Sequence, residues 1–314
     1  MSDVAVASRR AAANRAISRR PLGRRRRPSW LWTIPYLLPA AALIGFVFAY
    51  PLERVVQYSF ETTPNVPGSV FTTVNYSLAV EDPNFLSAIK HNLILLGAVP
   101  VLVVVALLLA ILSYRRTRSS NVYRSALFLP YVLSIPVVGI IFGIIYSLLG
   151  PLNAALGAVG LGGLKQDWLG NPSIALGSVI AVIIWKEFGF GLVLFSARMG
   201  TIDQELYDAA RVDGARWWSQ HRHVTIPALS QVIQFFITVE IITMLSAVFG
   251  YVYTMTRGGP GGATTVMEFQ IWEQGFASGN FGLASATAVI LLGGIVALLL
   301  IIVLARAASR KAFA

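Results

Sequence analysis

The stretch ELYDAARVDGARWWSQHRHVTIP, residues 205–227, is a charged segment between two long apolar runs. The rest of the chain is far more apolar: of its 314 residues 56% are hydrophobic and 12% are charged, and the mean hydropathy is +0.68. An ordinary globular domain carries about 25% charged residues. The composition therefore indicates an integral membrane protein, in which the charged segment is a loop outside the bilayer.

Six apolar runs are each long enough to cross a bilayer, which takes about 20 residues. A helix in a membrane satisfies its own backbone hydrogen bonds, so these runs predict an all-α membrane protein with six transmembrane helices. Buried helices of a large soluble protein are excluded because too little polar sequence remains to cover them. We place the runs at residues 30–56, 92–112, 125–149, 174–197, 226–254 and 283–305.

The lysines and arginines predict the orientation of this bundle. Nine precede the first run, four lie between the second and third, four between the fourth and fifth, and three follow the sixth, together 20 of the 25. Cytoplasmic loops of membrane proteins carry an excess of Lys and Arg, so the N and C termini and the segment 205–227 are predicted to be cytoplasmic. The net charge of +11 does not indicate nucleic-acid binding, because most of the basic residues lie in the segments on one side of the membrane.

The N-terminal sequence SRRPLGRRRRPSW, residues 18–30, has three interpretations. Two of them are an export or twin-arginine signal and an Arg-rich transit peptide. The apolar run that follows is longer than the ~7–15 residues of a signal peptide and has no clear small-residue cleavage site at its end. We therefore favour a topology anchor, with a basic cytoplasmic tail at 1–29, one six-helix domain at 30–306 and a cytoplasmic tail at 307–314.

Several runs contain proline, which removes a backbone donor and bends a helix. Kinked helices suit a bundle that lines a cavity and moves. Proline is also simply commoner in membrane helices than in soluble ones, so the sequence leaves both interpretations open. The prolines within the first three runs are Pro35, Pro39, Pro51, Pro100, Pro130 and Pro136.

The charged segment itself predicts two short helices. The first is capped by Thr201 or Asp203 and ends at Gly214, which can adopt the left-handed conformation. The second covers residues 215–223 and runs into the sequence TIP. Small alanines at 209 and 210 permit close approach of a partner, and exposed tryptophans are common interface anchors. The segment is therefore predicted to dock onto another protein in the cytosol.

The spacing within this segment resembles a family motif: E-A-A, three residues, G, nine residues, I-x-L-P. The motif marks the cytoplasmic loop of permease subunits in binding-protein-dependent ABC importers. The spacing matches at every position, with conservative replacements of Asp for Glu, Val for Ile and Ile for Leu. The resemblance implies that residues 201–227 form a coupling loop seated in a cleft of an ATPase subunit, with Pro227 as the hinge where the fifth span begins. The residues to which it assigns coupling are Glu205, Asp208, Ala209, Ala210, Asp213, Gly214 and Pro227.

Three further stretches, at residues 125–156, 166–176 and 253–276, resemble carbohydrate-uptake permeases, the class that serves maltose, other oligosaccharides and glycerol-phosphate. The T-x-G-G-P-G sequence in the last is similar to the first of two permeases, the maltose-permease F-like partner. The resemblance covers roughly residues 30–306. It implies a type I ABC importer permease fold in a bacterial or archaeal plasma (inner) membrane. The implied partners are membrane lipid, a second permease in a heterodimer, two ATPase subunits and an extracytoplasmic binding protein or lipoprotein.

The chain has no sequence for nucleotide chemistry. It lacks G-x-x-x-x-G-K-[ST], and RGGPGGATT at 257–265 has no lysine to reach a phosphate, so we interpret it as a turn or a buried dip of backbone. We expect no cofactor on this chain and no enzymatic activity of its own, with ATP and Mg used by the partner ATPase. His91, His221 and His223 have no converging ligands, so no metal site is predicted.

Lys186, Glu187 and Glu240 fall inside the apolar runs, where an ionisable group is costly and suggests function. Lys186 and Glu187 are neighbours about 100° apart on a helix, so an ion pair between them is awkward. Either could pair with Glu240 or face a cavity, and a structural role stays as open as a solute-binding one. In the resembling family the fifth span lines the sugar site. The candidate substrate path comprises Glu240, Thr243, Phe249, Tyr251, Trp185, Lys186 and Glu187.

Two other classes of function stay in view. A secondary transporter would work without an ATPase. A polytopic membrane enzyme would need catalytic carboxylates or metal ligands gathered at one membrane face, whereas the external acids are scattered through short loops. The aromatic residues Trp185, Trp168 and Tyr146 fit a sugar site and an interfacial belt equally well.

Overall fold

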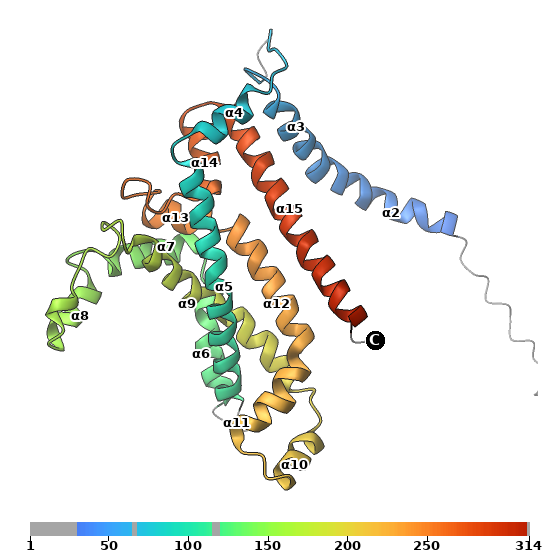
Figure 1. Cartoon of the computed structure of the whole chain (residues 1–314), viewed down its shortest axis with the longest axis vertical. Helices are drawn as coiled ribbons and strands as arrows, with labels where there is room; N and C mark the ends of the chain where they lie inside the picture. The colour runs from blue at the N-terminus through green and yellow to red at the C-terminus, as the bar shows by residue number, and fades with distance from the viewer. Residues whose placement is uncertain (1–29, 65–67, 115–119, 313–314) are drawn as a thin grey trace, which may run out of the picture. The chain divides into compact units, whose positions relative to one another are not determined.

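The fold is helical in the computed structural model, which describes residues 30–64, 68–114 and 120–312 (Figure 1). Within these residues the only bridge between extended segments joins Glu61 and Phe71. Five helices are long and apolar enough to cross a membrane, or six when one sharply bent pair is taken as a single span. The all-α prediction with six spans is confirmed. Backbone contacts divide the chain into two units, residues 1–54 and 55–314.

The described part of the first unit is one apolar helical stretch. Helix α2 (Trp30–Ile44) passes through a π turn, η1 (Gly45–Ala49), into α3 (Tyr50–Ser59), within which the division of the units falls. Pro35 and Pro39 lie inside α2. The candidate span covers Pro35–Ser59, and its side chains are mostly exposed up to Glu53, as expected of a helix that faces lipid, whereas Ser59 is buried. The predicted tail at 1–29 lies outside the described residues.

The second unit contains the remaining helices. They are α4 (Val74–Glu81), α5 (Phe85–Ser113), α6 (Ser120–Val132), α7 (Ile135–Ile145), α8 (Pro151–Ala158), η2 (Gly162–Leu164), α9 (Ala175–Met199), α10 (Gln204–Val212), α11 (Trp217–Gln220), η3 (His221–Thr225), α12 (Ile226–Ser246), α13 (Phe249–Met255), α14 (Met267–Trp272), η4 (Glu273–Ala277) and α15 (Phe281–Ala312). The last of these contains the predicted sixth span and continues to Ala312, so the predicted tail at 307–314 begins as helix.

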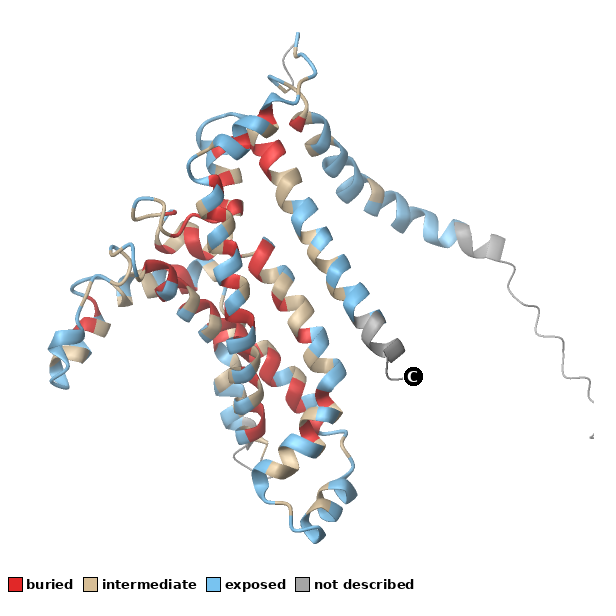
Figure 2. Ribbon diagram, in the orientation of Figure 1, coloured by how far each residue is buried: buried red, intermediate tan, exposed pale blue. Residues whose placement is uncertain are grey.

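The core of this unit lies where α5, α9 and α12 meet, and buried residues concentrate on these helices (Figure 2). Gly191 permits α5 and α12 to pack closely against α9. A Cβ atom there would lie 2.7 Å from both the Ala106 Cβ on α5 and the Phe236 ring on α12. Because lipid gives helices little hydrophobic reason to associate, small residues that permit close packing hold such bundles together.

The third span departs from its prediction as a single run over 125–149. Helices α6 and α7 are separate and bent by 94° at a break of two residues. Ser134 at the break is extended, with φ −68° and ψ 144°, and Pro136 occupies the first turn of α7. Proline is tolerated there because a first-turn N–H has no partner within the helix. Pro136 thus lies at the beginning of a helix, and not at a kink within one run as predicted.

The fifth span also departs from its prediction. One continuous helix runs from Trp217 to Ser246, so the predicted short helix at 215–223 and the predicted run at 226–254 begin and end differently. The π turn η3 carries the helix through, with the Ile226 N–H bonded to the His221 carbonyl. Pro227 follows this wide turn and lies in the first turn of α12. The helix stays continuous there although proline has no backbone N–H to donate. The docking segment and the fifth span are therefore joined by one helix, and the hinge at Pro227 stays a prediction.

Candidate functional site

The predicted coupling loop begins with a capped helix. The Asp203 carboxylate accepts the Glu205 N–H at 3.2 Å, at the first turn of α10. Of the two candidate caps, Asp203 therefore takes the role. The Thr201 hydroxyl is engaged elsewhere, since it accepts from the Arg198 guanidinium at 2.6 Å and donates to the Arg198 carbonyl at 2.9 Å.

The end of α10 is set by Gly214, whose φ is +77°. The Gly214 N–H bonds the Arg211 carbonyl at 3.0 Å and the Ala215 N–H bonds the Ala210 carbonyl at 2.9 Å. These two bonds form the glycine-dependent helix ending known as the Schellman motif, and they confirm the predicted left-handed cap. No atom lies within 4 Å of where a Gly214 Cβ would stand, so the space around it is open.

The outward side of α10 is exposed and carries most of the residues assigned to coupling. Leu206 is 53% and Val212 is 87% exposed, and Asp208 pairs with Arg211 at the surface. The helix lies at one end of the second unit, beyond the ends of the spans (Figure 1). The exposed residues that the prediction assigns to coupling are Glu205, Asp208, Ala209, Asp213, Gly214 and Pro227, whereas Ala210 is half-buried.

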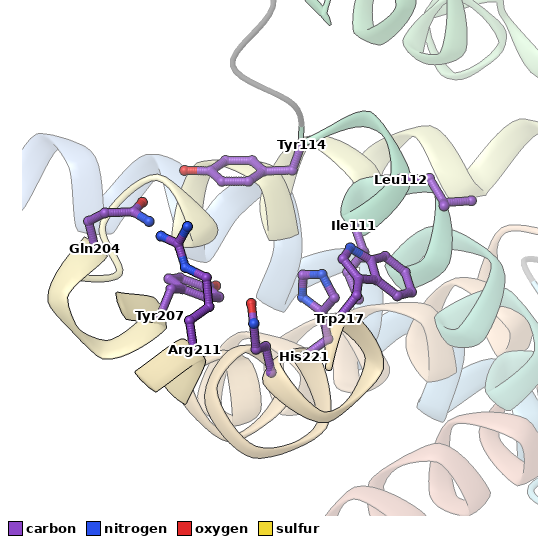
Figure 3. A pocket seen from close by; sticks show the side chains of 9 residues that line it. Ile111, Leu112, Tyr114, Gln204, Tyr207, Arg211, Trp217 and His221 are labelled. Carbon is purple, nitrogen blue, oxygen red and sulfur yellow. The ribbon is translucent and has the colours of Figure 1, made fainter. Parts of the chain in front are cut away.

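The inward side of α10 and α11 faces the end of α5 across a cavity of about 300 Å³ (Figure 3). Tyr207, Arg211, Trp217 and His221 line one side of it. The opposite side is formed by the last residues of α5 and by Tyr114, which follows that helix. Apolar, aromatic and basic groups therefore meet under the coupling loop.

Two side chains tie the coupling loop to the fifth span. The Tyr207 hydroxyl of α10 and the His221 Nδ1 atom both lie within hydrogen-bond distance of the Thr225 hydroxyl, at 2.9 and 2.8 Å. Thr225 is fully buried in the π turn. The Tyr207 contact thus connects α10 directly to the start of the fifth span. The sequence prediction did not include Tyr207, which directly precedes the motif, or Thr225, which lies within it.

The charged residues of the fourth span form a buried ion pair, which corrects the expectation that neighbours would not pair. Lys186 Nζ lies 3.3 Å from Glu187 Oε1, and both side chains are buried. The Tyr251 hydroxyl of α13 donates to the same Glu187 oxygen at 2.7 Å. Lys186 also donates to the Tyr131 carbonyl of α6 at 3.3 Å. Lys186 and Glu187 point about 100° apart on the helix, but the flexible lysine side chain bends towards Glu187 and so reaches its carboxylate.

Glu240 of α12 lies within electrostatic range of this pair but forms no ion pair with it in the described residues. It is 1% exposed, and its Oε2 atom has no hydrogen-bond partner among the described residues. Lys186 is paired with Glu187 and not with Glu240. Pairing with Glu240, one of the options open from the sequence, is therefore not observed in the described part of the chain.

The other candidate path residues lie in different surroundings. Phe249 belongs to an aromatic group with Tyr253, Phe269 and Trp272, whose ring centroids lie 4.9–6.4 Å apart. The Thr243 hydroxyl bonds a carbonyl of its own helix at 3.1 Å. Trp185 is 38% exposed and packs edge-on against Phe142. The structure thus bonds Lys186, Glu187 and Tyr251 together and places Glu240 within electrostatic range of them. Thr243, Phe249 and Trp185 make other contacts.

The loop at 257–265 is a partly buried turn, with Gly258, Thr264 and Thr265 buried. Thr264 and Thr265 donate to the carbonyls of Gly259 and Gly258, at 2.7 and 3.2 Å. The His91 Nδ1 atom of α5 lies 2.7 Å from the Thr265 carbonyl. Main-chain groups that would be costly in a membrane are thereby satisfied, as expected of a backbone dip.

Two of the stretches quoted for their resemblance are joined by Asn153. This buried residue of α8 donates to the Gln166 carbonyl at 2.9 Å and accepts the Trp168 indole N–H at 2.9 Å. It also donates to the Leu148 carbonyl at 3.0 Å. One amide therefore closes the loop between α7 and α9.

Comparison with known proteins gives a consistent result. Residues 93–310 match the family model described as the inner membrane component of binding-protein-dependent transport systems. A probable ABC transporter permease protein of Pyrococcus horikoshii is 31% identical over 272 residues, which cover 85% of this chain and 93% of that protein. The lactose transport system permease protein LacF of Rhizobium radiobacter is 32% identical over 245 residues, covering 77% and 82%.

A similar fold is found among solved structures. A bacterial ABC transporter involved in the import of the acidic polysaccharide alginate contains a chain that superimposes with a TM-score of 0.74. The identity is 24%, and the match covers 90% of this chain and 96% of the other. At this identity the likeness supports the fold alone.

Proposed function

This chain belongs to the inner membrane components of binding-protein-dependent transport systems, and on that premise we propose that it is one of two permease subunits of an ATP-driven importer for a sugar or sugar-like solute. The observation that carries the proposal is the coupling loop. Its motif spacing coincides with an exposed, capped helix that ends at a left-handed glycine and is hydrogen-bonded to the start of α12.

A carbohydrate solute is supported by the relatives that carry informative names. These include permease proteins of a lactose system, an sn-glycerol-3-phosphate system and an arabinooligosaccharide system, the last two 28% and 29% identical to this chain. Aromatic groups such as Phe249 and Trp272 fit the requirement of a sugar site for flat apolar faces.

The proposed complex has four further components. A second, similar permease completes the path, two ATPase subunits bind ATP and Mg on the cytoplasmic side, and an extracytoplasmic binding protein or lipoprotein delivers the solute. This chain binds no cofactor. We place the complex in a bacterial or archaeal plasma (inner) membrane, with the coupling loop and both termini in the cytosol in accordance with the distribution of basic residues.

In the proposed mechanism the ATPase pair closes on ATP and draws the paired coupling loops together. The displacement of α10 reaches α12 through the Tyr207 and His221 contacts to Thr225. The helix bundle then opens outward to accept the solute. A permease that bound the solute equally in both states would gain no direction from ATP, so the two states must differ in affinity or access.

Purification from the native membrane tests this proposal. Mild detergent extraction of the tagged chain, followed by identification of the copurifying proteins, is expected to yield a second permease and a nucleotide-binding subunit in stoichiometric amounts. A solute-binding protein is expected when solute is present. Recovery of the chain alone, with undiminished transport, would favour a secondary transporter, and recovery alone with a chemical activity would favour a membrane enzyme.

A further inference from the structure

Two helices of this chain are each followed by a short interruption. The third span is broken at residues 133–134, between α6 and α7, and residues 247–248 form a second interruption between the end of the fifth span at Ser246 and α13. The last carbonyls of a helix have no partner within it, and a bilayer core supplies no water to bond them. Each interruption therefore needs protein groups to satisfy it and to fix its angle.

Lys186 supplies such a group at the first interruption. Its ammonium donates to the carbonyl of Tyr131, next to the last residue of α6, and lies 5.0 Å from the centre of the Tyr131 ring. The two helices are held close at this level by Gly189, because a Cβ atom there would lie 2.9 Å from Tyr131 Cβ. The bend is thus held by a hydrogen bond and a cation–π contact to one residue.

Glu187 connects this bend to the second interruption. Its Oε1 atom accepts from both Lys186 and the Tyr251 hydroxyl of α13, and all three residues are nearly excluded from solvent. A buried lysine without a carboxylate would be strongly disfavoured, so the pair must act as a unit. The chain of contacts runs from α6 through α9 to α13.

The segments that follow the two interruptions pack directly against each other. A Cβ atom on Gly250 of α13 would lie 2.8 Å from Ile135 of α7, and one on Gly139 of α7 would collide with the Thr254 hydroxyl. The two glycines therefore allow α7 and α13 to touch along their length. Lys186 and Glu187 lie at the point where this packed pair joins α6 and α9.

We propose that Lys186, Glu187 and Tyr251 form a strut that holds the bend of the third span and α13 in a fixed relation, and that the charged pair positions the solute path without binding the solute. This inference rests on the proposed importer function. It assigns to Lys186 and Glu187 the structural alternative that the sequence left open. Lys186 Nζ and Glu187 Oε1 are bonded to Tyr131, Tyr251 and each other, whereas Glu240 keeps an oxygen without a partner in the described residues.

Uptake by reconstituted complexes tests the strut with three variants. Lys186→Met leaves Glu187 buried without its cation, so we expect the maximal uptake rate to fall about ten-fold with the apparent KM for solute within about two-fold. In the double variant Lys186→Met/Glu187→Gln the amide oxygen still accepts from Tyr251, and the rate should return to within about three-fold of the parent. Lys165→Met, the same change at an exposed lysine, is the control.

The opposite pattern would overturn the proposal. If Lys186 and Glu187 bind the solute, the double variant stays defective and its KM rises. A parental rate for Lys186→Met also contradicts the strut. Should that variant fail to assemble, Tyr251→Phe removes one hydrogen bond alone. It is expected to lower the maximal rate about three-fold at constant KM, and an unchanged rate is the contradicting result.

A distance measurement separates the strut from the transport function. The chain has no cysteine, so spin labels can be placed at two introduced cysteines, Leu129→Cys on α6 and Ile140→Cys on α7, both exposed positions. The label distance should be narrow in the parent, broad in Lys186→Met and narrow again in the double variant. An unchanged distribution in Lys186→Met refutes the strut even when the parent transports as proposed, and failure of parental transport leaves this distance test intact.

Discussion

Glu240 is the buried carboxylate of this membrane protein for which the described residues offer the least compensation. It is nearly inaccessible, and one of its oxygens has no hydrogen-bond partner. An ionisable group inside a membrane span is costly and usually faces a path or a polar partner. Since Lys186 is committed to Glu187, Glu240 is the strongest remaining candidate for a group that meets the solute.

Glu240→Gln tests this role because it preserves size while removing the charge. Uptake is expected to change by about ten-fold or more, in line with the 1.5–3 kcal/mol of a charged hydrogen bond, while the complex assembles normally. Solute uptake and the amount of copurifying complex are measured together. Ser246→Ala, at an exposed position on the same helix, is the matched control. Loss of assembly in Glu240→Gln would make the carboxylate structural instead.

Glu268 at the start of α14 predicts a pH dependence of stability. Burial raises the pKa of its carboxyl above the ordinary 4.5, and the hydrogen bond from Asn92 opposes this only in part. The folded state therefore holds the proton more tightly than the unfolded state does. The stabilisation is complete below the ordinary pKa and is lost as pH rises through the raised one.

Thermal unfolding of the purified protein across a pH series measures this effect. The melting temperature of the parent should fall with rising pH over that window. Glu268→Gln, which resembles the protonated form, should flatten the dependence, and Glu273→Gln at an exposed neighbour should not. A parental melting temperature that rises with pH through this window is incompatible with the assignment.

At the scale of elements, the end of α10 gives a sharp test of the coupling loop. Gly214 is left-handed and its surroundings are open, so a side chain there strains the backbone without any clash inside this chain. Gly214→Val should cost about 1–2 kcal/mol of local helix stability, because residues with a branched Cβ disfavour this conformation. Asparagine tolerates it.

We therefore expect Gly214→Val to weaken ATPase attachment and uptake, with normal amounts of protein in the membrane, and Gly214→Asn to retain both. Copurification of the ATPase and uptake at matched membrane levels are the measurements. If Gly214→Asn loses ATPase attachment and uptake as fully as Gly214→Val does, the ATPase requires the empty space beside Gly214 and not its left-handed backbone conformation. Normal uptake in the valine variant would remove the coupling assignment.

The loop between α7 and α9 depends on one amide. Asn153 bonds the backbone at Leu148 and Gln166 and accepts from the Trp168 indole, so Asn153→Ala leaves three partly buried polar groups without this partner. A loss of about 1–3 kcal/mol per unsatisfied group is expected. Limited proteolysis should then cut between 148 and 168, whereas Asn171→Ala, whose side chain bonds only Ser173, should stay resistant. Equal resistance of both variants contradicts this account.

Local signals in the sequence were sufficient to predict the ends of some helices but not of others. Asp203 and Gly214 mark the ends of α10 through bonds to residues within five positions, so pattern alone predicts them. The break at Ser134 was missed because it is held by Lys186, 52 positions away, whose bond to Tyr131 no local pattern contains. Continuity through Pro227 depends on a π turn, which the sequence does not distinguish from a helix end.

At the scale of the whole chain, composition and charge predicted the membrane class and the six spans because these are sums over many residues. The arrangement of the residues in the predicted solute path could not be predicted from the sequence. The loop at 257–265 and the start of α14 are anchored by His91 and Asn92, about 175 positions earlier in the chain. Phe249 and Tyr251 therefore point into different surroundings although they are two residues apart.

Large apolar side chains remain exposed on the described part of α15, among them Leu300, Ile301 and Leu304, at 56%, 62% and 66%. A soluble protein would not tolerate so long an apolar stripe. Lipid and a second permease are the surroundings that the proposed complex offers to it.

Solute accumulation in proteoliposomes that contain the purified complex distinguishes an ATP-driven importer from a secondary transporter. ATP is enclosed with the coupling loops, and binding protein and labelled oligosaccharide are supplied on the other side. We expect accumulation that requires ATP and binding protein together and that is weakened in Gly214→Val. Accumulation without ATP, driven by a proton or sodium gradient, would exclude the importer.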